Sequence, residues 1–253
     1  NRMLLAATCA LGFVLSPCAE AVYTIGKAEV VIWFCLGAVI FLLGGPLASG
    51  RRASPGRLAA SVFLGMWAVL TKETGLVVFL VIVLFGLAEW VAEPRAGRRR
   101  WLTYFAAAMT GFFISYILPS LLAGGERSYT ALKISAGSVL YNGYTYLILF
   151  PEMQILGLGA VALMGWRVWV EKALSRPVLA AACLEVAGVA HYAMLLVWHW
   201  PMGYAQAPAG LCWTSALAFA VAGIAISKRS AKLIGLGVAA LALVHAAGFA
   251  YVA

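Results

Sequence analysis

Residues 75–100 read GLVVFLVIVLFGLAEWVAEPRAGRRR, a long apolar run followed by a short turn and a cluster of arginines. About 20 apolar residues are needed to cross the roughly 30 Å hydrocarbon core of a bilayer. Basic residues at the end of such a run are retained on the cytoplasmic side. The stretch therefore predicts a membrane-spanning helix that ends at the cytoplasmic surface.

The same alternation of apolar runs and basic clusters continues along the chain. Thirteen of the 18 Lys and Arg residues fall in four clusters between apolar runs. The clusters are Arg51, Arg52 and Arg57; Arg95, Arg98, Arg99 and Arg100; Arg167, Lys172 and Arg176; and Lys228, Arg229 and Lys232. If all four clusters face the cytoplasm, the segments between them face outward. The connections at residues 44–57 and 92–100 are rich in Gly, Pro and Arg and predict plain turns.

The apolar runs predict an all-α, polytopic membrane protein with one transmembrane domain over residues 1–253. With 64% hydrophobic and 11% charged residues, the chain has too little polar surface to coat a water-soluble globule. About nine spans are predicted, at residues 3–16, 28–45, 58–71, 75–91, 101–122, 153–170, 177–198, 209–226 and 232–252. An N-terminus inside and a C-terminus outside make these spans alternate consistently. We expect an integral protein of the bacterial inner membrane.

Composition also disfavours several other classes of protein. The net charge of +9 is confined to short loops, where membrane topology already accounts for it, so the charge does not indicate nucleic-acid binding. The five cysteines lie mostly inside apolar runs without CxxC or metal-ligand spacing. They predict neither a disulfide framework nor a zinc site, and we expect no metal site.

Charged residues on the predicted outer side converge at the ends of spans. Lys27, Lys72 and Arg127 would lie on this face, where a cavity could hold an anionic group while a carboxylate transfers a proton. The simpler reading is that these are ordinary charges at headgroup depth. His199 either belongs to the interfacial aromatic belt or lines that cavity. Residues 139–151 predict an interfacial or re-entrant helix on the same side.

The sequence LTKETG at residues 70–75 places Lys72 and Glu73 in a very short turn between two apolar runs. Adjacent side chains point in different directions, so the two charges are not expected simply to neutralise each other. The alternative is that Lys72 extends to a lipid phosphate while Glu73 caps the next helix.

Glu185 is the carboxyl group placed deepest in the predicted spans, roughly eight residues into span 177–198. His191, six positions later, lies on another face of the helix, whereas Tyr192 shares the face of Glu185. We expect Glu185 to accept a hydrogen bond from Tyr192 or from another helix, or to stay protonated. His191 and His245 are expected to donate hydrogen bonds between helices.

Residues 11–87 resemble the integral-membrane glycosyltransferases of the GT-C class, which include the protein O-mannosyltransferases. LGFVLSPCAEAVYTIGKAEVVIWFCLGAVIFLL at 11–43 is similar to their outward turn with Glu-Ala-Val, an aromatic residue and a charged triplet. LGMWAVLTKETGLVVFLVIVLFGL at 64–87 is similar to their Ser-Lys-Glu-Thr segment. The resemblance covers about 77 residues.

The resemblance implies transfer of a sugar from a polyprenyl-phosphate donor at the outer face, with no cofactor beyond this donor. Lys72 would lie near the lipid phosphate, assisted by Lys27 or Arg127. Because the chain contains no Asp, carboxylate catalysis would fall to Glu20 and Glu73. The expected substrate-binding residues are Lys27, Lys72, Arg127, Tyr23 and His199.

Two readings of the resemblance stay open. GT-C enzymes carry an acidic outer loop, usually with Asp, which in this chain would precede Asn1. The chain is then either the downstream part of an active enzyme or a catalytically inactive subunit of a membrane complex. The partners expected are membrane lipids, a lipid-linked sugar and other membrane subunits. A transporter is disfavoured because the sequence lacks paired broken helices and an intramembrane chain of charges.

Overall fold

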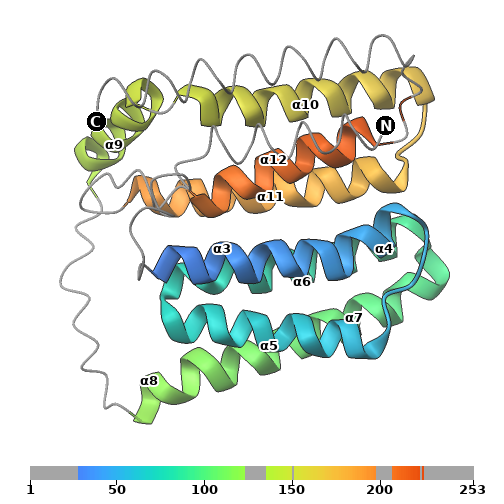
Figure 1. Cartoon of the computed structure of the whole chain (residues 1–253), viewed down its shortest axis with the longest axis horizontal. Coiled ribbons are helices and arrows are strands. Elements are labelled where there is room, and N and C mark those ends of the chain that lie inside the picture. Colours follow the sequence, from blue (N-terminus) through green and yellow to red (C-terminus); the bar gives the residue numbers. More distant parts are fainter. Residues whose placement is uncertain (1–27, 123–134, 150, 198–206, 223, 225–253) are drawn as a thin grey trace.

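The computed structural model of the protein describes residues 28–122, 135–149, 151–197, 207–222 and 224, and the regular elements within these ranges are all helical. The helices lie side by side in two layers (Figure 1). The first layer contains α3 (Ala28–Val39), the π-helical turn η1 (Ile40–Gly44), α4 (Gly45–Ala48), α5 (Pro55–Thr71), the 3-10 turn η2 (Glu73–Gly75), α6 (Leu76–Ala92), α7 (Pro94–Phe112), the π-helical turn η3 (Phe113–Ile117) and α8 (Leu118–Leu122). The second contains α9 (Ala136–Leu149), α10 (Pro151–Glu171), α11 (Arg176–Leu196) and α12 (Ala207–Val221).

Four helices are long and apolar enough to cross a membrane, which is compatible with a membrane protein. They are Val30–Ala48, Glu73–Ala92, Pro94–Leu122 and Arg176–Leu196, and they correspond to predicted spans 28–45, 75–91, 101–122 and 177–198. Predicted span 58–71 coincides with the shorter apolar helix Pro55–Thr71, and predicted span 209–226 overlaps the shorter apolar helix Pro208–Val221.

The remaining expectations are met in part or lie outside the described residues. Predicted span 153–170 coincides with helix α10, which is not among these four spanning candidates, and segment 139–151 largely coincides with α9. The depth of α9 in a membrane, the total of nine spans and the orientation of the termini stay predictions. Spans 3–16 and 232–252 lie outside the described residues.

Helices extend into two segments that the sequence predicted as plain turns. Residues 92–100 were expected to form a loop, but α7 begins at Pro94 and includes all four arginines of that cluster. Proline is favoured at the first helical position, where its missing N–H is not needed. In the second segment, residues 44–57, only residues 49–54 lie outside a helix. Ser54 caps α5, because its hydroxyl accepts a hydrogen bond from the N–H of Arg57 at 3.3 Å.

Helix α6 occupies the centre of the hydrophobic core. Its residues Val78, Val81, Ile82 and Phe85 are almost completely buried. The two layers meet where α6 packs against α11 and where α3 packs against α12. At the first of these contacts the Cys183 thiol donates a hydrogen bond to the carbonyl of Leu84 at 3.1 Å.

The α6–α7 hairpin is closed by contacts that require glycine. A Cβ atom added at Gly97 would lie 2.4 Å from the carbonyl oxygen of Glu89 and 2.5 Å from the Cα of Trp90. An added Cβ at Gly86 would lie 2.6 Å from the Cβ of Tyr104. The two helices therefore approach as closely as they do because glycine offers no side chain at these positions.

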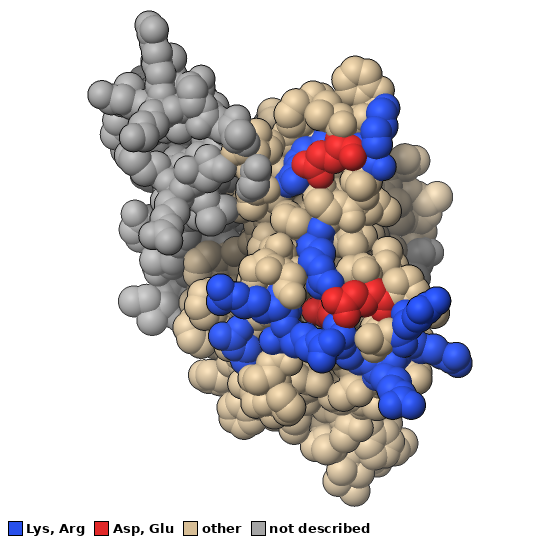
Figure 2. Space-filling view, turned by 90° about the vertical axis from the view of Figure 1, so that its right-hand side faces the viewer, with Lys and Arg blue, Asp and Glu red and all other residues tan. Residues whose placement is uncertain are grey.

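The basic clusters within the described residues gather at one end of the bundle. Figure 2 shows this end, with the Lys and Arg side chains around a few carboxylates. The three clusters of residues 51–57, 95–100 and 167–176 share the end because α5, α7 and α11 all begin there. The predicted topology requires these three clusters to lie on one side of the membrane, which is possible because they share one end of the bundle. We call it the basic end of the bundle.

Candidate functional site

A groove between α5 and α7 opens beside the basic end. Its volume is about 660 Å3, and it is lined by residues 52–55, 58, 59, 62, 63 and 66 on one side and by 89, 100, 103, 104, 107 and 110 on the other. We call it the α5–α7 groove. Its polar lining residues lie mostly near the starts of the two helices, and its α5 wall continues with Leu58, Val62, Phe63 and Met66. The groove is thus amphipathic, with a polar head and an apolar body.

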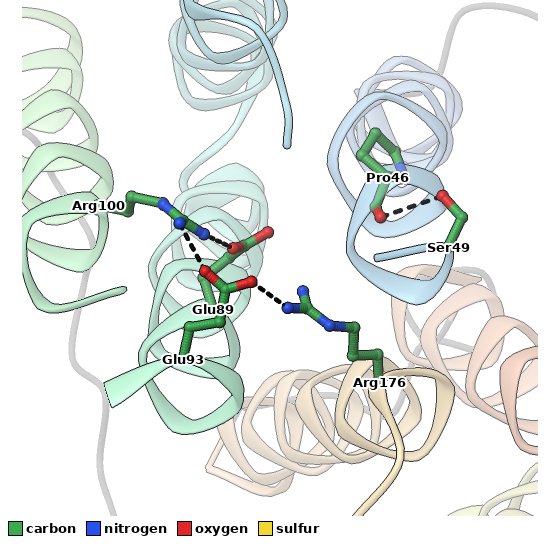
Figure 3. Close-up of polar contacts among 6 residues, drawn as sticks. All are labelled: Pro46, Ser49, Glu89, Glu93, Arg100 and Arg176. Carbon is green, nitrogen blue, oxygen red and sulfur yellow. Dashed lines mark hydrogen bonds and ion pairs between the residues drawn. The ribbon is translucent and has the colours of Figure 1, made fainter. Parts of the chain in front are cut away.

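Arg100 lies in the polar head and binds two carboxylates at once. Its Nη1 donates to Glu89 Oε2 at 2.6 Å, and its Nη2 donates to Glu93 Oε2 at 2.6 Å (Figure 3). Glu89 is only 3% exposed although it lies in the wall of the groove. A buried carboxylate needs such a partner because the loss of hydration strongly disfavours an unpaired charge.

Glu93 connects the groove to the second layer. Its other carboxylate oxygen accepts a hydrogen bond from Arg176, at the start of α11 (Figure 3). The hydrogen bonds from Arg100 and Arg176 lower the pKa of the Glu93 carboxyl below its ordinary value of 4.5. Glu93 therefore stays ionised at neutral pH. We call Glu89, Glu93, Arg100 and Arg176 the ion-pair network.

Two polar side chains of the groove remain available to a ligand. Arg52 is exposed and forms no ion pair or hydrogen bond with residues in the described part of the chain. Tyr104 is 7% exposed, and its hydroxyl forms no hydrogen bond within the same ranges. The head of the groove thus offers one unpaired cation and one phenolic donor.

A second ionic cluster at the basic end holds α10 to α12. Arg167 is 5% exposed and donates from Nη1 to the carbonyl oxygens of Ala220 at 3.0 Å and Ala222 at 2.8 Å. It also donates from Nε to Glu171 at 2.7 Å and from Nη2 to the Ser175 hydroxyl at 3.2 Å. These bonds occupy carbonyls that the end of a helix leaves without partners. We assign Arg167 a structural role.

Lys72 and Glu73 lie at the opposite end of the bundle, because α5 begins at the basic end and ends at Thr71. Lys72 is extended, with φ −164° and ψ 147°, and its N–H donates to the Ala68 carbonyl at 3.0 Å. Both side chains are half-buried. The turn is pressed against α5, since a Cβ atom added at Gly75 would lie 2.4 Å from the carbonyl carbon of Ala68.

Only these two of the predicted site residues fall within the described part of the chain. Glu20, Tyr23, Lys27, Arg127 and His199 lie outside it, so their convergence with Lys72 and Glu73 stays a prediction. Within the described ranges, no group of three or more His, Cys, Asp or Glu side chains could hold a metal ion.

Sequence reasoning missed the groove and its polar residues, Arg52, Glu89, Arg100 and Tyr104. One signal was present, namely a glutamate inside the predicted span 75–91, because an ionisable residue inside a span is usually paired or functional. Arg100, eleven positions later, is that partner.

The expected pairing of Glu185 with Tyr192 is not observed. The Tyr192 hydroxyl instead accepts a hydrogen bond from Gln154 Nε2 at 2.9 Å. Glu185 lies beside the indole of Trp213 on α12, and its Oε2 atom is buried without a hydrogen-bond partner in the described residues. The Nε1 atom of Trp213 also has no hydrogen-bond partner among the described residues, so the expected hydrogen bond from another helix is not observed either. His191 is buried on the same helix, while His245 lies outside the described residues.

Comparison with known proteins gave no match, whether to a family model, to a curated protein or to a solved structure.

Proposed function

We propose that the protein binds a membrane lipid with an anionic, phosphate-bearing head in the α5–α7 groove. The observation that carries this proposal is the continuity of an unpaired guanidinium, Arg52, with an apolar wall that runs along α5. A lipid has the same two parts in the same order. Its head would lie at the basic end and its acyl chain against Leu58, Val62 and Met66.

The polar head provides the selectivity of this site. In a bilayer the acyl chain exchanges one apolar neighbour for another, so chain burial contributes little driving force. A phosphate group, in contrast, gains charge-assisted hydrogen bonds from Arg52, and the planar guanidinium matches two phosphate oxygens. The Tyr104 hydroxyl adds a donor, whereas the guanidinium of Arg100 is already paired with Glu89 and Glu93. The groove therefore favours anionic over neutral lipids.

Removing the free cation or filling the groove is expected to weaken anionic lipid binding. Arg52→Gln should lower the affinity for phosphatidylglycerol about tenfold, because it removes a hydrogen-bonded charge pair. Ala59→Trp should lower it at least as much, since residue 59 is exposed and lines the groove. Native mass spectrometry of the detergent-solubilised protein, titrated with phosphatidylglycerol or phosphatidylcholine, measures both effects.

Matched controls come from the same helix. Arg57→Gln removes an exposed arginine of the same cluster, and Ala60→Trp adds the same indole one position away, yet neither residue lines the groove. Both controls should bind phosphatidylglycerol like the unmodified protein. Equal losses in Arg52→Gln and Arg57→Gln would instead indicate diffuse attraction to the basic end and would contradict the proposed site.

A second proposal, sugar transfer from a polyprenyl-phosphate donor as in the GT-C class, concerns the other end of the bundle. It is supported by the Lys72–Glu73 turn, which the close approach at Gly75 fixes against α5. Lys72 would offset the charge that develops on the departing lipid phosphate. The α5–α7 groove lies at the basic end, so it does not serve this reaction. The alternative remains an inactive GT-C-like subunit, which would bind lipid in the groove and transfer no sugar.

Lys72→Ala is expected to lower sugar transfer about 100-fold, which is the usual effect of removing one group that stabilises developing charge. Lys72→Arg keeps the charge and should retain part of the activity. The assay follows label from a polyprenyl-phosphate hexose into the acceptors of permeabilised membranes. Normal transfer by Lys72→Ala would remove Lys72 from the reaction, and no transfer by the unmodified chain would favour the inactive subunit.

A further inference from the structure

We infer that Glu89 makes the groove selective for a headgroup with a single negative charge over one with two. The inference rests on the proposed lipid binding and adds the charge of the ligand to it. Glu89 is the only acidic residue in the lining of the groove, within the part of the chain that the structure describes. Its position deep in the wall gives it an influence on any anion bound there.

The charges of the groove lining, taken together with the ion-pair network to which it belongs, nearly cancel. In the ion-pair network, the two carboxylates of Glu89 and Glu93 balance the two guanidinium groups of Arg100 and Arg176. The network therefore carries no net charge, and Arg52 leaves the head with a charge of +1. A phosphodiester, with one negative charge, neutralises this head. A phosphomonoester brings a second negative charge that has no counterpart in the lining of the groove, because the other arginines of the basic end, such as Arg51 and Arg57, do not line it.

The second negative charge of a phosphomonoester would also lie near the carboxylate of Glu89, which is held in place. Glu89 is 3% exposed and is held by Arg100 at 2.6 Å, so it stays in the wall of the groove. Repulsion between like charges is stronger there than in bulk water, because Glu89 is buried in protein of low dielectric constant. Arg100 offers limited relief, since its Nη1 and Nη2 atoms already donate to Glu89 and Glu93.

Replacing Glu89 by Gln tests the inference directly. Gln keeps the size of the side chain and an oxygen that can accept the bond from Arg100, while it removes the negative charge. Phosphatidylglycerol carries one negative charge, and phosphatidic acid carries close to two at pH 8 because the second pKa of a phosphomonoester is near 6. The measured quantity is the ratio of the affinities for these two lipids, by native mass spectrometry at pH 8.

The unmodified protein is expected to prefer phosphatidylglycerol. Glu89→Gln should shift the ratio about tenfold toward phosphatidic acid. Comparing ratios cancels the difference in headgroup size, because both proteins face the same pair of lipids. Glu171→Gln is the matched control: it removes a carboxylate paired with Arg167 elsewhere at the basic end, and it should leave the ratio unchanged.

A second measurement needs no substitution and therefore does not depend on the folding of a variant. Between pH 8 and pH 5 phosphatidic acid loses its second charge, whereas phosphatidylglycerol keeps its single charge. The affinity of the unmodified protein for phosphatidic acid, relative to phosphatidylglycerol, should rise about tenfold over this range.

The outcomes separate this inference from the proposed function. An unchanged ratio in Glu89→Gln, or a preference of the unmodified protein for phosphatidic acid at pH 8, would overturn the role of Glu89 while leaving lipid binding intact. If the unmodified protein binds neither anionic lipid better than phosphatidylcholine, the proposed function fails and this inference fails with it.

Discussion

Arg167→Met is expected to lower the free energy of unfolding by about 3 kcal/mol, because it leaves two carbonyl oxygens at the end of α12 without their donor. Those carbonyls belong to Ala220, which is completely buried, and to Ala222. Methionine replaces the aliphatic part of the arginine side chain, so the decrease in the free energy of unfolding comes more from the lost hydrogen bonds than from lost packing. A cation at the carboxyl end of a helix also interacts favourably with the helix dipole.

The effect of Arg167→Met is measured by thermal unfolding in detergent, where the midpoint should fall by about 10 °C. Arg98→Met serves as the control, since Arg98 is exposed and has no ion-pair partner among the described residues. Its midpoint should change by less than about 2 °C. Equal midpoints for the two variants would show that Arg167 does not hold α10 to α12.

Gly97→Ala is the second substitution with a large expected effect, about 3 kcal/mol of destabilisation. The new Cβ atom would meet the carbonyl oxygen of Glu89 at 2.4 Å and the Cα atom of Trp90 at 2.5 Å. Both are backbone atoms, so no flexible side chain can move out of the way. The α6–α7 hairpin must then open, which would also move Arg100 away from Glu89.

Gly159→Ala is the same substitution at a glycine with free space around it, and it is expected to stabilise the protein. Gly159 lies inside α10, and a Cβ atom added there would meet nothing within 4 Å. Alanine should therefore raise the free energy of unfolding by up to about 1 kcal/mol, through its higher helix propensity. The two variants are compared by unfolding in the same detergent. A stabilising Gly97→Ala would contradict the close contact between α6 and α7.

The sequence predicted individual helices better than their contacts. Predicted span 75–91 matches α6 to within one residue at each end. The apolar run is bounded by the turn at residues 72–75 before it and by Pro94 after it. The predicted start of the next helix, at residue 101, is wrong, because α7 begins at Pro94 and includes the arginines at 95–100. Arginine side chains can extend toward water from a helix, so charge alone does not end one.

The candidate site was harder to predict for a physical reason. The groove depends on α5 and α7 lying next to each other and starting at the same end, and this neighbourhood comes from the packing of both on α6. Arg52 and Glu89 are 37 positions apart and share no local pattern. Lys72 and Glu73, in contrast, are adjacent in the sequence, so their common turn could be predicted from one short motif.

The helices on either side of the groove differ greatly in length. Helix α5 has 17 residues, whereas the continuous helix Pro94–Leu122 has 29. At a rise of about 1.5 Å per residue they measure about 26 Å and about 44 Å, against a hydrocarbon thickness of about 30 Å. A membrane can accommodate both neighbours if the long helix tilts or extends its arginine-bearing first turns into the headgroup region, or if the lipids beside α5 compress. In each case the two walls of the groove end at different depths, so a lipid at its mouth would contact helix surface on the α7 side over a greater length than on the α5 side.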